Sequence, residues 1–460
     1  MALKLLILFV GVAGFFYLLV RKPEYIAAIL FTLVIARVNF DLKGMPMNTR
    51  ALVTLALFGR IIIDKPVQRE FSSFLKLHYI KLLIAFLTYV LFISLWQDTF
   101  KADMLKETIA IILASFCLFH FVKKMGNVNV VKWATLASGL ICFADLAYTY
   151  KVYGNFPMHR LYYILNGTAD SLSDDDLDAM ANWNFFGQIC GMAFVYVFTD
   201  YVKNRTGNKY ILLLLPVMLG GVMMSTSRSA ILGLLVVSIL VVLNSLNYHE
   251  QKRKVFRLGG FIVGMAIVGV LLFSAVSKLV SLDSSFLDQI TSRLTDEPVA
   301  VFRKTMGLSY NVNNLGPMAW REESAENAYS AYLNLPIVEQ FFGIGTGGFE
   351  LRNLGHGLNA HNATLLLLIE SGIFGFLLFF SLVGGTIIKS ISARNVSPSL
   401  AVVCFILVYG LAQNRDWTSF IMCLYVVCNI TELEMLKPAK KSRQPILPPR
   451  TTETLNIQSR

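Results

Sequence analysis

Charged residues and cysteines are scarce in this chain of 460 residues. Charged residues make up 15% of the sequence, whereas hydrophobic residues make up 55%. This balance excludes a soluble globular domain, because the apolar runs are too many and too long for a buried core. The 6 cysteines all fall in apolar runs, so no disulfide framework supports the polar loops. The composition therefore predicts an integral membrane protein.

Sequence patterns of several catalytic and transport classes are also absent. No His-Glu-x-x-His pattern or cysteine pair supports a zinc site, and no Gly-Lys-Ser/Thr sequence supports a P-loop. No nucleophile elbow appears, and the two halves of the chain lack the similarity that is typical of transporters. We expect no metal and no cofactor. We interpret the acidic run Asp174–Asp178 as a solvated loop, with a divalent-cation site as the alternative.

Apolar segments dominate the sequence, and their lengths suit helices that cross a bilayer. We predict an all-α integral membrane protein of about twelve or thirteen transmembrane helices, with a large helical extracytoplasmic loop before the third-last or second-last helix. Two segments, 51–63 and 417–431, are short enough to be re-entrant. The candidate spans are residues 3–20, 25–40, 51–63, 78–96, 107–122, 130–148, 183–200, 209–225, 229–247, 258–277, 361–388, 399–413 and 417–431.

Basic residues concentrate in alternate loops, and this distribution predicts the orientation of the chain. The positive-inside rule makes these loops and the basic tail 437–460 cytoplasmic. We expect the tail to be disordered and to lie near anionic lipid, so the net charge of +12 indicates a bilayer partner and no nucleic acid. The long segments 149–182 and 278–360 then lie on the opposite, extracytoplasmic side.

The chain divides into five predicted parts. They are N-terminal transmembrane helices (1–150), central transmembrane helices with the outer loop 149–182 (151–277), an extracytoplasmic loop (278–360), C-terminal transmembrane helices (361–436) and a cytoplasmic tail (437–460). Two sets of apolar residues in the large loop recur at helical spacing: Phe286, Ile290 and Leu294, and Ala325, Ala328, Tyr332 and Leu335. We expect two or three amphipathic helices that lie over the membrane face and cover a polar site.

The pair His361-Asn362 is the strongest candidate for such a site. It stands where the apolar segment 361–388 begins, on the predicted outer side, with Gly372 and Gly375 following. A polar, titratable group at the mouth of a transmembrane helix costs several kcal/mol unless it is paired or faces water. We therefore predict that His361 and Asn362 belong to a functional site.

Two arginines on the same predicted face are candidates for binding an anion. Arg228 lies between Ser227 and Ser229, whose hydroxyls add hydrogen-bond donors, and Arg321 follows Trp320. A guanidinium is permanently charged and donates two parallel hydrogen bonds to phosphate or carboxylate. The alternatives are an interfacial arginine extending to headgroups for Arg228 and a salt-bridged surface residue for Arg321.

Further polar and glycine-rich positions complete the candidate site. Asn182 and Asn184 open the span 183–200, where they bind a sugar or, as the alternative, cap the helix. Arg303 and Arg352 are outer cations that could take the role of Arg321. The stretch Phe342-Gly-Ile-Gly-Thr-Gly-Gly-Phe349 lacks the βαβ context of a dinucleotide site. Its glycines, Gly345 and Gly347 among them, offer backbone N–H groups to a phosphate or form a tight connector.

The order of these features resembles the O-antigen ligase and O-antigen polymerase superfamily of bacterial envelope polysaccharide enzymes. The matching stretches are Asn182-Trp-Asn-Phe-Phe-Gly187, Thr226-Ser-Arg-Ser-Ala-Ile-Leu232, the outer Arg321, Phe342-Gly-Ile-Gly-Thr-Gly-Gly-Phe349, and His361-Asn followed after nine residues by Gly372-x-x-Gly375. The resemblance covers roughly residues 180–390. It implies a multi-pass protein of the bacterial inner membrane whose active site faces the periplasm or exterior.

The resemblance also implies the activity, an inverting, metal-independent glycosyl transfer. The donor is a lipid-linked oligosaccharide on undecaprenyl diphosphate, and the acceptor is a hydroxyl of a glycan. His361 is expected to orient or deprotonate the acceptor hydroxyl, and Arg228 and Arg321 to hold the diphosphate. We favour a polymerase, with an O-antigen ligase acting on lipid A–core or another acceptor as the alternative and a transporter of lipid-linked glycan as the second alternative. Other envelope polysaccharide assembly proteins are candidate partners.

Overall fold

The described part of the chain is built almost entirely from helices. The computed structural model describes residues 13–23, 25–27, 39–42, 45–63, 67–125, 129–153, 183–203, 213–225, 227–246, 253, 255–256, 259–260, 299–300, 303–304, 306–309, 316–355, 360, 362–392, 396–411 and 424–432. The all-α prediction is confirmed for these residues apart from one hairpin. In it, β1 (Asn39–Leu42) pairs in antiparallel fashion with β2 (Met45–Asn48).

The described helices cover predicted apolar segments and four further stretches, 67–75, 316–333, 337–342 and 348–351, that lie outside the predicted spans. The described helices are α3 (Thr49–Ile63), α4 (Val67–Leu75), α5 (His78–Trp96), α6 (Ala102–Met125), α7 (Asn129–Tyr153), α10 (Trp183–Lys203), α11 (Leu214–Met224), α12 (Arg228–Leu246), α16 (Gly316–Leu333), α17 (Ile337–Phe342), α18 (Gly348–Leu351), α19 (Ala363–Ser392) and α20 (Pro398–Gly410). Residues 424–432 are helical as well.

Four described segments are long and apolar enough to cross a membrane: His78–Trp96, Met104–Phe121, Arg228–Ser245 and Ala363–Ile391. Shorter apolar helices cover Leu52–Ile63, Val131–Ala144, Leu214–Met224 and Pro398–Gly410. The predicted span 258–277 falls almost wholly outside the described residues. The structure thus identifies an integral membrane protein by length and composition, and the number of about twelve spans stays a prediction.

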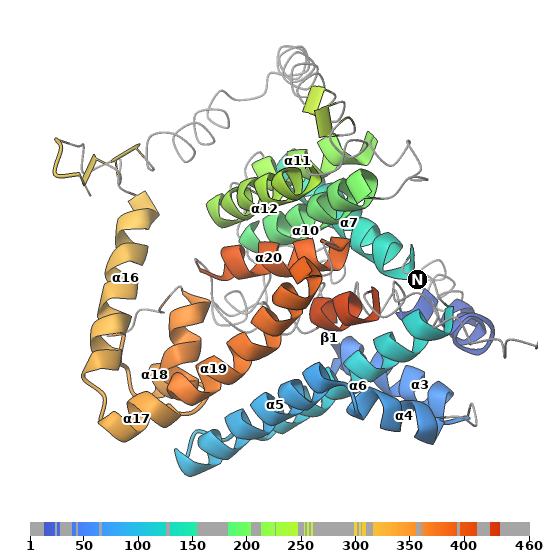
Figure 1. Ribbon diagram of the computed structural model, residues 1–460, viewed down its shortest axis with the longest axis horizontal. Coiled ribbons are helices and arrows are strands. Elements are labelled where there is room, and N and C mark those ends of the chain that lie inside the picture. Colours follow the sequence, from blue (N-terminus) through green and yellow to red (C-terminus); the bar gives the residue numbers. More distant parts are fainter. Residues whose placement is uncertain are drawn as a thin grey trace, which may run out of the picture.

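Two groups of helices form the body of the protein (Figure 1). In the first, α10 contacts α7, α11, α12 and α20, and its side chains from Phe186 to Asp200 are all buried. The second contains α3, α4, α5 and α6. Helix α19 joins them, because it packs on α5 along most of its length and also contacts α20. Helix α10 is therefore the centre of one bundle, and α19 is the link between the two.

Polar contacts tie the helices of the first group together at one end. Lys132 at the start of α7 pairs with Asp200 near the end of α10. Lys203 at the end of α10 donates to Asn244 near the end of α12 at 2.8 Å. Ser399 on α20 donates to Glu432 in the last described helical segment at 2.6 Å. Buried polar groups need such partners, and here they fix the relative register of helices at this end.

Helix α19 is broken at Gly372, which corrects the prediction of one continuous span over 361–388. Gly372 has φ 64° and ψ −177°, and the parts before and after it run in different directions (Figure 1). The leucine-rich part before the break packs with Ala328, Tyr332 and Leu335 in a separate hydrophobic cluster. The part after the break, residues 373–392, extends about 30 Å at 1.5 Å per residue, enough to cross a bilayer.

The large loop contains a helix over the second set of periodic apolar residues. On α16, Ala328 and Tyr332 are buried, and Leu335 just beyond its end is buried with them. Ala325 is half-buried on the same face. These residues pack on Ile344, Phe349 and Ile369, so the loop and the first part of α19 share one core. The second predicted face, at Phe286, Ile290 and Leu294, lies outside the described residues.

Candidate active site

Gly343, which follows α17, and Gly372, at the break in α19, allow a close approach between distant parts of the chain. A Cβ atom on Gly343 would lie 2.3 Å from the carbonyl oxygen of Glu370. In the reverse direction, a Cβ on Gly372 would lie 2.3 Å from the carbonyl oxygen of Phe341 and 2.5 Å from the Gly343 nitrogen. Both glycines also have positive φ, at 90° and 64°. Only glycine fits at both positions without moving one backbone away from the other.

The backbone N–H groups of the glycine-rich loop are engaged within the protein. Ile344 donates to the carbonyl of Ile369 (3.3 Å), Gly345 to the carbonyl of Glu370 (3.0 Å), Thr346 to Ser94 Oγ (3.0 Å), Gly347 to Glu370 Oε1 (2.8 Å) and Gly348 to the carbonyl of Gly345 (3.0 Å). A phosphate-binding role for Gly345 and Gly347 would require these bonds to open. The observed arrangement is the tight connector, the other alternative of the sequence analysis.

Helix α5 completes this contact. The Tyr89 hydroxyl lies 2.9 Å from the carbonyl oxygen of Phe342 and 3.1 Å from that of Ser371, so it bridges the loop and α19. The Gln97 side-chain amide donates to the carbonyl of Gly343 at 3.2 Å. We call this meeting point of the loop 343–348, residues 370–372 of α19 and the C-terminal end of α5 the glycine junction.

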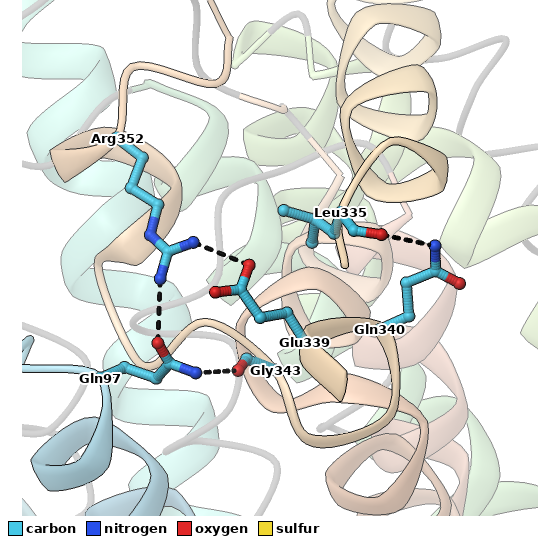
Figure 2. A network of polar contacts seen from close by, with 6 residues as sticks. All are labelled: Gln97, Leu335, Glu339, Gln340, Gly343 and Arg352. Atoms are coloured by element: carbon cyan, nitrogen blue, oxygen red, sulfur yellow. Dashed lines mark hydrogen bonds and ion pairs between the residues drawn. The ribbon is translucent and has the colours of Figure 1, made fainter. Parts of the chain in front are cut away.

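Arg352 is held by a polar network beside the glycine junction (Figure 2). Its Nη1 donates to Glu339 Oε2 at 2.8 Å, and its Nη2 donates to Gln97 Oε1 at 2.9 Å. Gln340 donates to the carbonyl of Leu335 at 2.8 Å, which connects α17 to the end of α16. Both terminal nitrogens of Arg352 thus donate to acceptors of the protein, as in a structural ion pair.

Asn362 caps the N-terminus of α19. Its Oδ1 accepts hydrogen bonds from the N–H groups of Thr364 and Leu365, each at 3.1 Å. This is the usual role of an asparagine before a helix, and it uses the side-chain oxygen but leaves the amide nitrogen for other contacts. His361 directly precedes this cap in the sequence and lies outside the described residues.

Two of the stretches that resemble the O-antigen enzymes meet in the first helix group. Gly187 on α10 lies against the turn between α11 and α12, where a Cβ would be 2.2 Å from Ser225 Oγ and 2.9 Å from Ser227 Cβ. Ser225 in turn accepts from the Ser227 N–H at 3.3 Å. Arg228 is the first residue of α12 and is half-buried. The fold thus presents a guanidinium at a helix N-terminus, where backbone N–H groups also favour an anion.

Two buried polar groups are next in sequence to this contact: Ser227 precedes Arg228, and Gln188 follows Gly187. Ser227 Oγ and Gln188 Nε2 have no hydrogen-bond partner among the described residues, although Ser227 is 0% and Gln188 is 1% exposed. Such groups are costly unless water or a ligand pairs with them. Ser229, two residues after Ser227, is also buried. Gln188 is not among the residues predicted from the sequence, although its spacing of four residues from Asn184 places both on one side of α10 and could have indicated it.

The remaining candidates are only partly described. Arg321 and Asn184 lie within α16 and α10, which fixes their places in the fold but not their side-chain contacts. Arg303 is exposed. Asn182 and the run Asp174–Asp178 lie outside the described residues. Within the part that the structure describes, no three His, Cys, Asp or Glu side chains gather to hold a metal ion.

Burial also affects one titratable group beside the glycine junction, outside the predicted spans. It raises the pKa of the Tyr332 phenol, which therefore stays protonated. The Tyr332 hydroxyl lies 3.3 Å from the carbonyl oxygen of Gln340 and donates to it. Tyr89 and Gln97 are junction residues that the sequence did not single out, because nothing local distinguishes them from other polar residues in or near apolar helices.

Comparison with known proteins assigns this region. Residues 210–380 match the family model described as O-antigen ligase. The match begins before α11 and ends within α19, so it includes Arg228, Arg321 and the two parts of the glycine junction that come from the loop and from α19. A search of curated proteins found no match. The match supports the O-antigen ligase and polymerase superfamily, an integral-membrane assignment and a role in polysaccharide biosynthesis.

Proposed function

We propose that this member of the O-antigen ligase and polymerase superfamily polymerises a glycan. The donor is the glycan on an undecaprenyl-diphosphate carrier, the acceptor is a hydroxyl of a second lipid-linked glycan, and the reaction takes place at the extracytoplasmic face of the inner membrane. The observation that supports glycosyl transfer, which polymerase and ligase share, is the match over residues 210–380, which includes every structural feature of the candidate site except α10 and α5.

The proposed chemistry needs one base and a cationic site for the leaving group. The acceptor oxygen attacks the anomeric carbon, the bond from that carbon to the diphosphate breaks, and the configuration inverts. His361 receives the proton of the acceptor hydroxyl. Arg228, at the positive end of α12, and Arg321 hold the diphosphate as its charge increases. No step requires a metal or a cofactor.

The structural contacts refine which cation accompanies Arg228. Arg352 already donates to Glu339 and Gln97, and Arg303 is exposed. We therefore retain Arg321, on a helix that packs against α19, as the second diphosphate ligand. Ser227, Ser229, Asn182, Asn184 and Asn362 are proposed to bind the sugar or phosphate oxygens, and we add Gln188 because its buried amide needs a partner.

The proposal is tested with purified protein in vesicles that contain a lipid-diphosphate glycan. His361→Ala and Arg228→Ala should each reduce product formation by a factor of about 100 or more, since a general base or a charge-stabilising group typically contributes that much. Arg253→Ala, at an exposed arginine outside the candidate site, is the matched control and should retain turnover. Normal turnover in both site variants would reject the assignment.

The description of the matching family favours one alternative, an O-antigen ligase. A ligase transfers the glycan to lipid A–core or another acceptor that differs from the donor. The same vesicle assay separates the two activities. Chain growth with the lipid-linked repeat as the only substrate indicates a polymerase, whereas product that appears only after addition of a different acceptor indicates a ligase.

A further inference from the structure

Helix α17 has the reverse of the usual polarity of a surface helix. Its apolar side chains face outward: Ile337 is 64%, Val338 48%, Phe341 40% and Phe342 38% exposed. None of its residues is buried. A helix that faces water normally directs its apolar side chains to the core and its polar ones to solvent. This helix instead leaves four large apolar side chains partly exposed, and two of them, Phe341 and Phe342, also contact Phe374 of α19.

The polar side chains of α17 are bonded to other parts of the protein (Figure 2). Glu339 accepts a hydrogen bond from Arg352 at 2.8 Å. Gln340 donates to the carbonyl groups of Leu333 and Leu335, at 3.1 Å and 2.8 Å. The orientation of α17 is therefore fixed by hydrogen bonds and an ion pair, and its apolar face cannot turn inward without breaking them.

The apolar face of α17 continues into the outward surfaces of two candidate membrane spans. Phe342 contacts Trp96 at the end of α5 and Phe374 at the start of the second part of α19, with ring centroids 5.9 Å and 5.2 Å apart. Trp96 is 51% and Phe374 is 46% exposed. Further along the same helices, Phe92 and Leu377 are 62% and 55% exposed. Aromatic side chains at the ends of spans are typical of the boundary between membrane and water.

We propose that α17 is embedded in the lipid interface, on the side of the membrane where α5 ends. The occupant of its apolar face is the bilayer itself, at the depth where headgroups meet acyl chains. Continuity with the outward surfaces of α5 and α19 favours lipid over a second copy of the chain, because those surfaces must contact acyl chains if the helices cross the membrane.

Embedding α17 has a consequence for the glycine junction. Gly343 follows α17 directly, and Tyr89, Gln97 and Arg352 connect the helix and this loop to the rest of the junction. A helix held at the headgroup level therefore sets the depth of the junction and of the first part of α19. This inference goes beyond the proposed reaction and holds whatever the substrate is.

The inference is tested by the depth of spin labels in vesicles of phosphatidylethanolamine and phosphatidylglycerol. Val338→Cys on the apolar face of α17 and Glu350→Cys at an exposed position of α18 are labelled separately with a nitroxide in the full-length protein. The cysteines that the structure describes are buried or half-buried, so unsubstituted protein gives the background. We expect the label at 338 to collide more often with oxygen than with a water-soluble nickel chelate, and the label at 350 to show the opposite.

Each other outcome overturns the proposal. A label at 338 that is as accessible to the nickel chelate as the label at 350 would place α17 in water. Dipolar broadening between labels at 338 in neighbouring molecules would show that a second copy covers the face. A change from chelate to oxygen accessibility only after addition of undecaprenyl diphosphate would assign the face to the donor lipid. The assay requires no turnover, so its result is independent of the proposed activity.

Discussion

Backbone geometry explains two of the glycines that the sequence places around His361. Gly343 and Gly372 face each other at the glycine junction, and each would bring a Cβ to 2.3 Å from a carbonyl oxygen of the other segment. Gly347 also has positive φ, at 75°, but a Cβ there would meet open space. A side chain would therefore clash at Gly343 and Gly372 but not at Gly347. The sequence alone does not distinguish these three glycines.

At this scale we predict that Gly372→Ala destabilises the protein. The substitution combines a left-handed backbone conformation with a clash against backbone atoms, so a loss of roughly 2–4 kcal/mol is expected. The measurement is thermal unfolding in detergent, followed with a dye that fluoresces when buried cysteines become exposed.

Two matched variants separate the causes of this loss. Gly347→Ala has the strained φ without the clash, so its loss should be smaller, about 1 kcal/mol. Gly384→Ala lies in the helical part of α19 with open space, and it should be neutral or slightly stabilising. Equal unfolding temperatures for Gly372→Ala and Gly384→Ala would contradict the described junction.

The element that organises the candidate site is the broken helix α19. Its first part belongs to the core of the large loop, and its second part lies against α5. Asn362 caps the first part, and the break separates it from the span. Asn362, the second residue of the predicted pair His361-Asn362, is therefore positioned by the part of α19 that packs with the loop and not by the span itself.

The division of α19 predicts unequal effects of two similar truncations. Ile369→Ala removes a side chain that is 0% exposed in the loop core, and it should cost about 2–4 kcal/mol through the cavity that it leaves. Leu377→Ala, at a residue that is 55% exposed, should change the unfolding temperature little. The comparison uses the same dye assay. A larger effect at Leu377 would show that the first part of α19 does not pack as described.

The whole molecule has two distinct ends along α5. Lys76 precedes this helix and is exposed, whereas Glu350 is exposed on α18, beside the glycine junction at the other end of α5. A helix of this length and hydropathy, if it crosses the membrane, must place these two positions on opposite sides. The charge distribution predicts that the Lys76 side is cytoplasmic.

This arrangement predicts the labelling of single cysteines in intact cells. Glu350→Cys should react with a membrane-impermeant maleimide added from outside in spheroplasts, and Lys76→Cys should react only after the membrane is opened. Unsubstituted protein measures labelling of the native cysteines. Reaction of the cysteine at 350 exclusively from the cytoplasmic side would invert the topology and remove the basis of the proposed function.

Local properties of the sequence were sufficient to predict where many of the described helices lie. Hydropathy and length predicted α5 over residues 78–96 as the structure has it, and helical spacing predicted the buried face of Ala328, Tyr332 and Leu335. They also pointed to Arg228 and to the glycine-rich stretch. These properties act over a few neighbouring residues, because solvation and backbone hydrogen bonding in a helix are local.

Only the tertiary structure decided which other segments those helices pack against. An apolar run reads the same in lipid and in a protein core, so hydropathy could not reveal that the first part of α19 packs with the loop. The ion pair of Arg352 with Glu339, the bridge from Tyr89 to two carbonyl groups and the outward apolar face of α17 all depend on contacts between segments. Such contacts arise from packing between distant parts of the chain, and no local pattern encodes them.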